Sequence, residues 1–382
     1  MKTKRTLYWI TTLSIALLCG CTDISKEIRP LDCPTFKLDV NNISQLNIAD
    51  FAEFSTVIPL ETSTESIIGQ IKKVFIIDSL ILVWDHKGHN VLLFNEKGKY
   101  KHRIGKQGGA PEEYKEIMDV YVTSENLIQI LDNKSRRILT FNLSGEYIDC
   151  KTLPYYLYSF YPTENGIWGV NSYQNEERYY LIHLPSSSTD QIDFGYFSNQ
   201  ADLTLLMTNN FETNEKTEDV FFHYCYDDII YKIEEGKLNP YIDIDFGDQK
   251  APYNYDKTEE LDEKMITNSY LGQIHNLYAY GEHLFFSFYR HETNKATFNE
   301  YQVYISTKTG DCTVCQYDIK HSDEITISPI PNIVGISDGK LIYQIIPDIL
   351  PPNLIGRLND MMPDNKVVAE DSNPVLVLYK LK

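Results

Sequence analysis

The stretch WDHKGHNVLLFNEKGKY, residues 84–100, decides the fold because the chain repeats it. The segment LDNKSRRILTFNLSGEY, residues 131–147, aligns with it without a gap at an offset of 47 residues. Around the first copy, short apolar runs separated by turn residues predict four strands, at 74–77, 80–84, 91–94 and 99–104. A four-stranded unit that recurs every 40–50 residues or so is typical of a β-propeller blade.

The two copies share the residues that such a blade needs at its turns. Asp85 and Asp132 stand between the second and third strands, where a carboxylate can accept hydrogen bonds from its own loop backbone. Gly98 and Gly145 stand in the next turn and can supply a positive φ. The strand at 80–84 is apolar on both faces, which predicts burial between neighbouring sheets, and the last strand is polar and predicts an edge.

Four weaker units follow, at about 153–194, 203–246, 273–317 and 333–380. The sixth unit has only three strands, and Phe54–Leu60 is available as its missing outer strand. That pairing would join the two ends of the chain and remove the open edge of the ring. Segments 256–270 and 354–362 have helical patterns and are expected as small insertions. The predicted fold is therefore an all-β, six-bladed β-propeller over residues 54–382.

The chain begins with features of an export signal. Basic residues at positions 2, 4 and 5 precede an apolar run from Leu7 to Leu18, which is shorter than the roughly 20 residues that a spanning helix needs. The run ends in Leu18-Cys19-Gly20-Cys21, which resembles the lipobox of bacterial lipoproteins. We therefore expect a signal peptide at 1–20, lipidation of Cys21, and a tether over 21–53; an ordinary secretory signal with an incidental Cys21 is the alternative.

The charge of the chain limits its partners. Removing residues 1–20 takes away three basic residues and no acidic one, so the formal net charge changes from −19 to −22. A body this acidic is not expected to bind nucleic acid or anionic lipid through its overall charge.

Cysteine usage gives no disulfide framework. Five cysteines follow Cys21, an odd number at wide spacings: Cys33, Cys150, Cys225, Cys312 and Cys315. The last two have CxxC spacing, but they lie in a strand pattern, where residues three apart face opposite sides. A pair of buried small residues or a local disulfide is favoured over a zinc or redox site.

Three segments resemble one known family. They are the glycine-rich loop Gly105–Tyr114, the fourth-unit pattern of Asp227–Ile233 followed by Ile242–Gly247, and the chain end Asn373–Lys382. Together they resemble the six-bladed, NHL-like β-propeller lipoproteins of Bacteroidota, over about residues 55–382. Glu113 departs from the register that the family usually has in the loop. The resemblance implies a fold and a cell-envelope location, but members of that family mostly have no assigned activity.

No catalytic motif is recognisable: the sequence has no nucleophile elbow, phosphate-binding loop or HExxH. Asp85, His86 and His89 could hold a metal ion, but a solvated turn is the favoured interpretation. The loop Gly105–Tyr114 is interpreted as backbone curvature at a blade junction. No metal or cofactor is predicted, although an axial Ca²⁺ or Zn²⁺ held by side chains from several blades would leave no trace in residue spacing.

Aromatic residues are densest at 155–161. Because aromatic rings can stack on sugar rings, the best candidates for binding residues are the four tyrosines of this segment: Tyr155, Tyr156, Tyr158 and Tyr161. Blade packing is the competing interpretation, since aromatic residues favour strands in any case. The leading functional hypothesis is a monomeric, non-enzymatic propeller, lipid-anchored in the outer membrane of a Gram-negative bacterium, that binds an envelope protein, peptide or glycan. The alternative is a metal-dependent hydrolase or lyase that acts on an envelope substrate.

Overall fold

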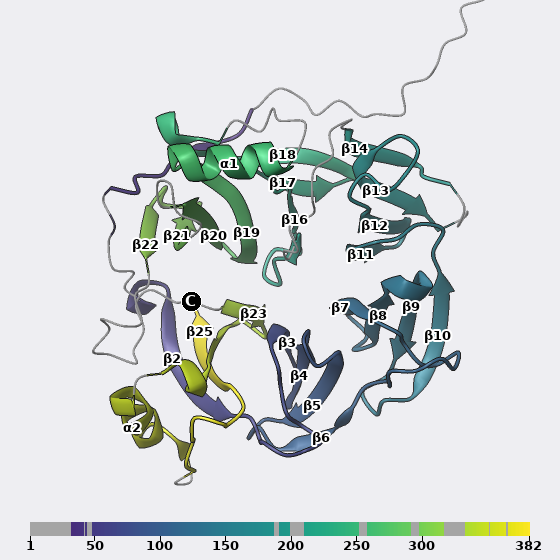
Figure 1. The fold of residues 1–382 in the computed structure, drawn as a ribbon, viewed down its shortest axis with the longest axis vertical. Helices are drawn as coiled ribbons and strands as arrows, with labels where there is room; N and C mark the ends of the chain where they lie inside the picture. Colours follow the sequence, from purple (N-terminus) through teal and green to yellow (C-terminus); the bar gives the residue numbers. More distant parts are fainter. Residues whose placement is uncertain are drawn as a thin grey trace, which may run out of the picture.

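The structure is a ring of β-sheets around a central axis (Figure 1). This computed structural model describes residues 32–41, 43, 48–186, 191–198, 210–251, 258–291, 298–316, 333–350, 352–363 and 366–382. The expected signal peptide and Cys21 lie outside the described residues. The strands of the described residues form six sheets, so the predicted all-β, six-bladed propeller is confirmed.

The first three blades have four antiparallel strands each, which follow one another from the axis outward. Blade one contains β3 (Ile71–Ile77), β4 (Leu80–Asp85), β5 (Asn90–Asn95) and β6 (Tyr100–Arg103). Blade two contains β7 (Ile117–Val122), β8 (Ile128–Asp132), β9 (Arg137–Phe141) and β10 (Tyr147–Thr152). Blade three contains β11 (Ser159–Thr163), β12 (Gly166–Val170), β13 (Tyr179–Pro185) and β14 (Phe194–Ser198).

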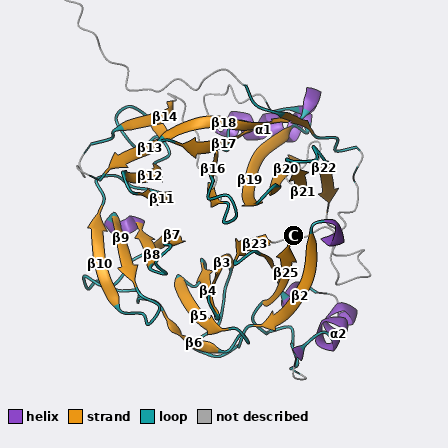
Figure 2. Ribbon diagram, turned by 180° about the vertical axis from the view of Figure 1, so that it is seen from behind, coloured by secondary structure: helices purple, strands orange, loops and turns teal. Residues whose placement is uncertain are grey.

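The other three blades complete the ring (Figure 2). Blade four contains β15 (Phe211–Thr213), β16 (Val220–His223), β17 (Ile229–Glu234) and β18 (Lys237–Asp245), with β1 (Thr35–Lys37) added outside β18. Blade five contains β19 (Leu271–Tyr280), β20 (His283–His291), β21 (Phe298–Ser306) and β22 (Cys312–Gln316). Blade six contains β23 (Ile333–Ser337), β24 (Lys340–Ile345), β25 (Val375–Leu381) and β2 (Ala52–Pro59).

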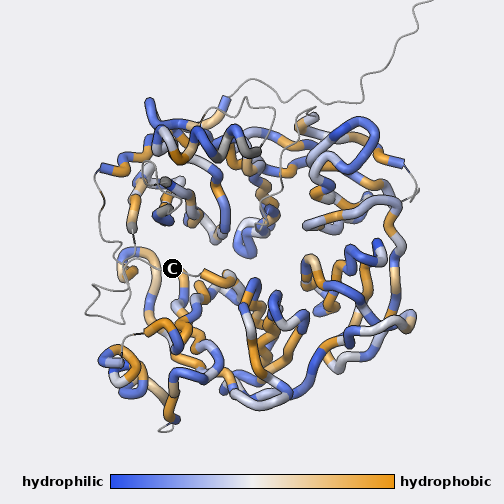
Figure 3. Tube along the Cα trace, in the orientation of Figure 1, coloured by the Kyte–Doolittle hydropathy of each residue, from blue (hydrophilic) through white to orange (hydrophobic). Residues whose placement is uncertain are grey.

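Hydrophobic packing between blades holds the ring together. Strand β4 is apolar on both faces because each face meets a different neighbour. Leu82 and Trp84 pack in a cluster with blade two, whereas Ile81 and Val83 pack in a cluster with blade six. The other blade interfaces have clusters of the same kind. Figure 3 shows hydrophobic stretches along the strands of the blades.

Ring closure follows the predicted scheme. Strand β2 pairs antiparallel with β25, and the register places Val57 opposite Val377 and Pro59 opposite Val375. The outermost strand of blade six thus comes from the N-terminal side of the chain and the other three from the C-terminal side. This pairing covers the edge that blade six would otherwise leave open.

The folded part begins earlier than expected. The sequence predicts a tether over 21–53, but Thr35–Lys37 form β1, which pairs parallel with Asp243–Asp245 of β18. Leu38 and Val40, which follow β1, are buried in the cluster between blades four and five. These residues therefore belong to the body of the propeller, and any tether is correspondingly shorter.

Both predicted helical insertions are present. Helix α1 spans Thr258–Asn268 and α2 spans Pro352–Asp360. Leu354 and Leu358 of α2 are buried in the cluster between blades five and six, which holds this helix against the outside of the ring. Four short 3₁₀ turns complete the described elements: Ile48–Asp50, Asn133–Ser135, Gly247–Gln249 and Pro347–Ile349.

The turn residues of the repeat act as predicted. The Asp85 carboxylate accepts hydrogen bonds from the backbone N–H groups of Gly69, Gln70 and Gly88, at 2.9–3.1 Å. Asp132 has the equivalent place in blade two. Gly98 has φ of 74°, and a Cβ atom there would lie 2.2 Å from the carbonyl oxygen of Pro59. Glycine therefore allows this turn of blade one to pack against β2, the strand that closes the ring.

Candidate functional site

A cavity of about 410 Å³, which we call the axial pocket, lies on the axis of the ring. Residues of all six inner strands line it, including Lys73 of β3, Tyr121 of β7, Tyr161 of β11, Glu212 of β15 and Ser337 of β23. Its volume falls in the range of roughly 300–1,000 Å³ that is typical of small-molecule sites. The axial pocket is therefore a candidate ligand site that is large enough for a small molecule.

Of the four tyrosines proposed as binding residues, the structure places only Tyr161 in the axial pocket. Its ring packs edge-on against Tyr121, with centroids 5.5 Å apart, and lies 6.1 Å from Phe211. Burial raises the pKa of Tyr121 well above its ordinary value, so this hydroxyl stays protonated. Three blades thus contribute one aromatic ring each to the same wall.

The other three tyrosines lie elsewhere. Tyr155 packs against the cluster between blades two and three, and Tyr158 against the cluster between blades three and four. Tyr156 is 46% exposed, and the guanidinium of Arg136 lies 5.6 Å above its ring. Strand β11 begins only at Ser159, so the preceding tyrosines do not share its alternation and do not face the axis. Blade packing thus accounts for the positions of Tyr155 and Tyr158.

An ion pair joins the inner strands beside the axial pocket. The ammonium of Lys73 lies 2.7 Å from the carboxylate of Asp119, whose side chain is 4% exposed. The same carboxylate accepts hydrogen bonds from the Ser159 hydroxyl at 3.0 Å and the Phe160 N–H at 3.2 Å. Asp119 therefore connects blades one, two and three at the axis.

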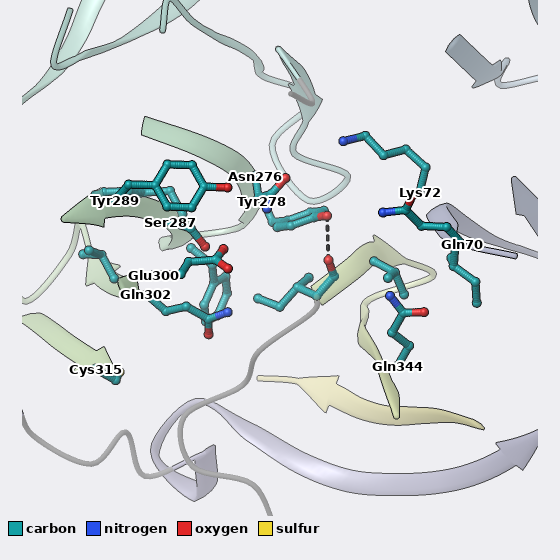
Figure 4. Close-up of a pocket in the computed structure, with 16 residues that line it drawn as sticks. Gln70, Lys72, Asn276, Tyr278, Ser287, Tyr289, Glu300, Gln302, Cys315 and Gln344 are labelled. Carbon is teal, nitrogen blue, oxygen red and sulfur yellow. Dashed lines mark hydrogen bonds between the residues drawn. The ribbon is translucent and has the colours of Figure 1, made fainter. Parts of the chain in front are cut away.

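A second cavity, of about 170 Å³, lies between blades five, six and one, and we call it the polar pocket (Figure 4). Ser287, Tyr289, Glu300 and Gln302 approach it from blade five. Lys72 of blade one and Gln344 of blade six approach it from the other side. Tyr278 and Val334 line both the polar pocket and the axial pocket, so the two cavities adjoin.

The acidic group of the polar pocket is held in place by its neighbours. Glu300 lies 3.2 Å from Nε2 of His275, whose Nδ1 lies 2.9 Å from the carbonyl oxygen of Gln273. Burial raises the pKa of Glu300, but the hydrogen bond and charge of His275 and the hydrogen bond of Ser287 outweigh it, so the pKa lies below its usual value. Glu300 is therefore an ionised acceptor with 44% of its side chain exposed.

The basic group of the polar pocket is Lys72. Burial and the neighbouring charge of Lys73 lower its pKa, and the charge of Asp119 opposes that change. The pocket thus combines one carboxylate and one amine on opposite walls, with amide and hydroxyl groups between them.

Strand β19 carries unusual backbone at this site. Its pairing with β20 shifts register on both sides of His275, and Gln273 and Asn276 have φ of 58° and 52°. A residue other than glycine in this region costs about 1–3 kcal/mol, and such strain is common at ligand sites. The irregular backbone places His275 against Glu300 and Asn276 in the wall of the polar pocket.

Metal-site candidates find no support in the described part of the chain, where no group of three or more His, Cys, Asp or Glu side chains is arranged to hold an ion. One carboxylate oxygen of Asp85 is already used by three backbone N–H groups. The ring centroids of His86 and His89 are 6.4 Å apart. The described residues therefore contain no cluster of three such side chains that could hold an ion on the axis.

The loop Gly105–Tyr114 makes structural contacts at the junction of blades one and two. Arg137 donates hydrogen bonds to the carbonyl oxygens of Pro111 and Glu113, at 3.1 and 2.8 Å. Tyr114 is fully buried and donates to the carbonyl oxygen of His89. These contacts agree with the interpretation of this loop as a blade junction.

Cys312 and Cys315 form no disulfide with each other, and they face opposite sides of blade five. Cys312 packs toward blade four and Cys315 is buried toward blade six, as strand alternation predicts. The local disulfide left open by the sequence is absent. Burial raises the pKa of Cys312 to about 11, which disfavours the thiolate that metal or redox chemistry requires.

Comparison with known proteins agrees with the fold. A family described as a domain of unknown function (DUF4934) matches residues 33–380, so this chain belongs to that family. No curated protein matches the sequence.

Two solved structures share the architecture. A protein from Bacteroides fragilis, described as exported, is 16% identical with a TM-score of 0.69, over 91% of this chain and 99% of its own. A member of the DUF4221 family from Bacteroides vulgatus is 11% identical with a TM-score of 0.52, over 90% and 99%. These likenesses support the fold alone. Among the described helices, none has the length and hydrophobicity needed to cross a membrane.

Sequence reasoning missed the polar pocket. Its charged and amide side chains come from blades one, five and six. Lys72 and Glu300, for example, are more than 200 residues apart in the sequence. These side chains come together only in the folded ring, so their spacing in the sequence does not predict the pocket. The one available signal was the polar interruption Gln273, His275, Asn276 in an otherwise apolar inner strand.

Proposed function

We propose that this protein is a lipid-anchored, monomeric cell-envelope protein that binds a ligand in the axial pocket without catalysing a reaction. The observation that carries this proposal is a cavity of about 410 Å³ to which every blade contributes, with the rings of Tyr121, Tyr161 and Phe211 along one wall. A rigid cavity with aromatic walls and a few polar groups is the usual form of a small-molecule or peptide site. The ligand is a glycan, a peptide or an exposed segment of an envelope protein.

We propose that lipid on Cys21 anchors the protein in the outer membrane of a Gram-negative bacterium. The basic residues, the apolar run and the lipobox-like sequence of residues 1–21 support this anchor. Two or more acyl chains provide stable attachment, whereas one chain is marginal. We expect Cys21→Ala to move the protein from the membrane fraction to the soluble fraction, as measured by fractionation and by mass spectrometry of the N-terminal peptide. Cys33→Ala is the matched control, and equal release of both variants would contradict the assignment.

Ligand binding is expected to depend on Tyr161. The probe is an array of glycans and peptides applied to the full chain in detergent micelles, followed by calorimetry with each compound retained. Because Tyr161 presents an aromatic ring to the axial pocket, Tyr161→Ala should weaken binding about tenfold, or about 1.4 kcal/mol.

Tyr156→Ala is the control, since it removes the same side chain from a site outside both pockets. Circular dichroism melting of both variants checks that the fold is intact. The proposal would be contradicted if the wild-type chain bound no compound, or if the two variants lost the same amount of affinity. The metal-dependent hydrolase or lyase remains the competing hypothesis, and elemental analysis of the purified chain tests it.

A further inference from the structure

Gln344 in the wall of the polar pocket has an unsatisfied hydrogen-bonding atom. The residue is 8% exposed, and within the described part of the chain its Oε1 has no hydrogen-bond partner. A buried acceptor without a donor costs about 1–3 kcal/mol. The side chain nevertheless lines a cavity rather than packed protein, so a bound molecule can supply the missing donor (Figure 4).

The other side chains of the polar pocket define the chemistry of that molecule. Gln70, Asn276 and Gln302 add three more amides, each of which can both donate and accept. Glu300 accepts and Lys72 donates, so the charged groups offset each other. Phosphate recognition ordinarily uses several cations or a row of backbone N–H groups, whereas the polar pocket presents one amine and, on the opposite wall, one carboxylate.

A hydroxyl-rich ligand fits this set best. Each hydroxyl group donates one hydrogen bond and accepts up to two, so it can pair with an amide, a carboxylate or an amine. An anionic oxygen could not donate to Gln344. An apolar ligand would leave the amides of the pocket unsatisfied.

We infer that the polar pocket binds one sugar residue at the end of a glycan chain, and this inference rests on the function proposed for the axial pocket. The cavity of about 170 Å³ suits a single six-membered ring and is too small for a longer chain. Because Tyr278 and Val334 border both cavities, a glycan with its terminal residue in the polar pocket continues into the axial pocket. There Tyr161 lines the wall and offers an aromatic ring to a following sugar.

The irregular strand β19 supports this assignment. Tyr278 donates a hydrogen bond to the carbonyl oxygen of Ile333 at 2.8 Å, which links β19 to blade six where the two cavities meet. Between Gly272 and Tyr278 the regular pairing of β19 with β20 is interrupted. The interruption, including the left-handed Asn276, thus shapes the pocket wall and holds Glu300 through His275.

The test uses the full chain in detergent micelles and a panel of neutral monosaccharides, neutral oligosaccharides, uronic acids and free amino acids. Saturation-transfer NMR detects binding and calorimetry measures it. Neutral saccharides should bind, and Gln344→Leu should weaken their binding at least tenfold. The same substitution should leave thermal stability unchanged or raised, because it removes an unsatisfied acceptor.

Gln129→Leu is the matched control. Gln129 also has a buried Oε1 without a partner in the described residues, but it lines neither pocket, so saccharide binding should be unchanged. Tyr161→Ala distinguishes the contributions of the two cavities, since it should weaken the binding of oligosaccharides and leave the binding of monosaccharides unchanged.

Three outcomes would overturn the inference. Binding of amino acids or uronic acids in preference to neutral saccharides would give the polar pocket another ligand class and leave the proposed function standing. Saccharide binding that depends on Tyr161 but not on Gln344 would also leave that function standing, with the sugar in the axial pocket alone. Binding of no panel member, and of no glycan or peptide on the arrays, would remove both proposals.

Discussion

Replacing Asp119 with alanine should lower the free energy of unfolding by about 3–5 kcal/mol, the cost of leaving one member of a buried ion pair without its partner. Asp119 is 3% exposed and accepts hydrogen bonds from Lys73, Ser159 and Phe160. Its loss would leave the Lys73 ammonium, whose side chain is 18% exposed, without its carboxylate. It would also remove the connection that Asp119 makes between blades one, two and three.

Urea unfolding followed by tryptophan fluorescence measures this effect. The control is Asp219→Ala, which removes a carboxylate 2.8 Å from Lys232 at a position where both side chains are about a quarter exposed. A surface pair of this kind contributes about 0–1 kcal/mol, and Lys232 keeps Glu234 as a partner. A similar loss of unfolding free energy in the two variants would show that Asp119 does not stabilise the ring more than a surface carboxylate does.

The repeat made the fold predictable because it is local. Residues 84–100 and 131–147 contain a whole turn–strand–turn unit each, and the hydrogen bonds of Asp85 and Asp132 lie largely within their own blades. Closure by β2 was predictable for another reason. The sixth unit lacked one strand, and an unpaired strand pattern stood near the other end of the chain.

What could not be predicted depends on contacts between distant segments. Strand β1 has only three residues, Thr35–Lys37, and its partner in β18 lies more than 200 residues away. The same holds for the candidate sites. Tyr161 reaches the axial pocket because β11 is an inner strand, whereas Tyr155, Tyr156 and Tyr158 precede that strand. Glu300 and Gln344 line the same pocket only because blades five and six are adjacent in the ring.

The same substitution, aspartate to asparagine, should have different effects at the two equivalent turn residues. Asp132 uses both carboxylate oxygens: Oδ1 accepts from the N–H groups of Glu116 and Ser135, and Oδ2 accepts from the N–H of Lys115 and from Arg137. An asparagine side chain has only one accepting oxygen, so one of the two carboxylate oxygens is replaced by an NH₂ group. Asp132→Asn therefore places an NH₂ group against two donors in a side chain that is fully buried.

Asp85 differs because all three of its backbone hydrogen bonds are made by Oδ1. Its Oδ2 is buried without a hydrogen-bond partner in the described residues, so an NH₂ group there displaces no bond. We expect Asp132→Asn to lower the free energy of unfolding by about 3 kcal/mol and Asp85→Asn by about 1 kcal/mol, since orphaned donors cost about 1–3 kcal/mol and loss of charge weakens the remaining bonds. Urea unfolding of both variants measures the difference, and Asp149→Asn, at an exposed position of β10, serves as the control. Equal losses at positions 85 and 132 would mean that the charge of the carboxylate, and not the number of its accepting oxygens, stabilises these turns.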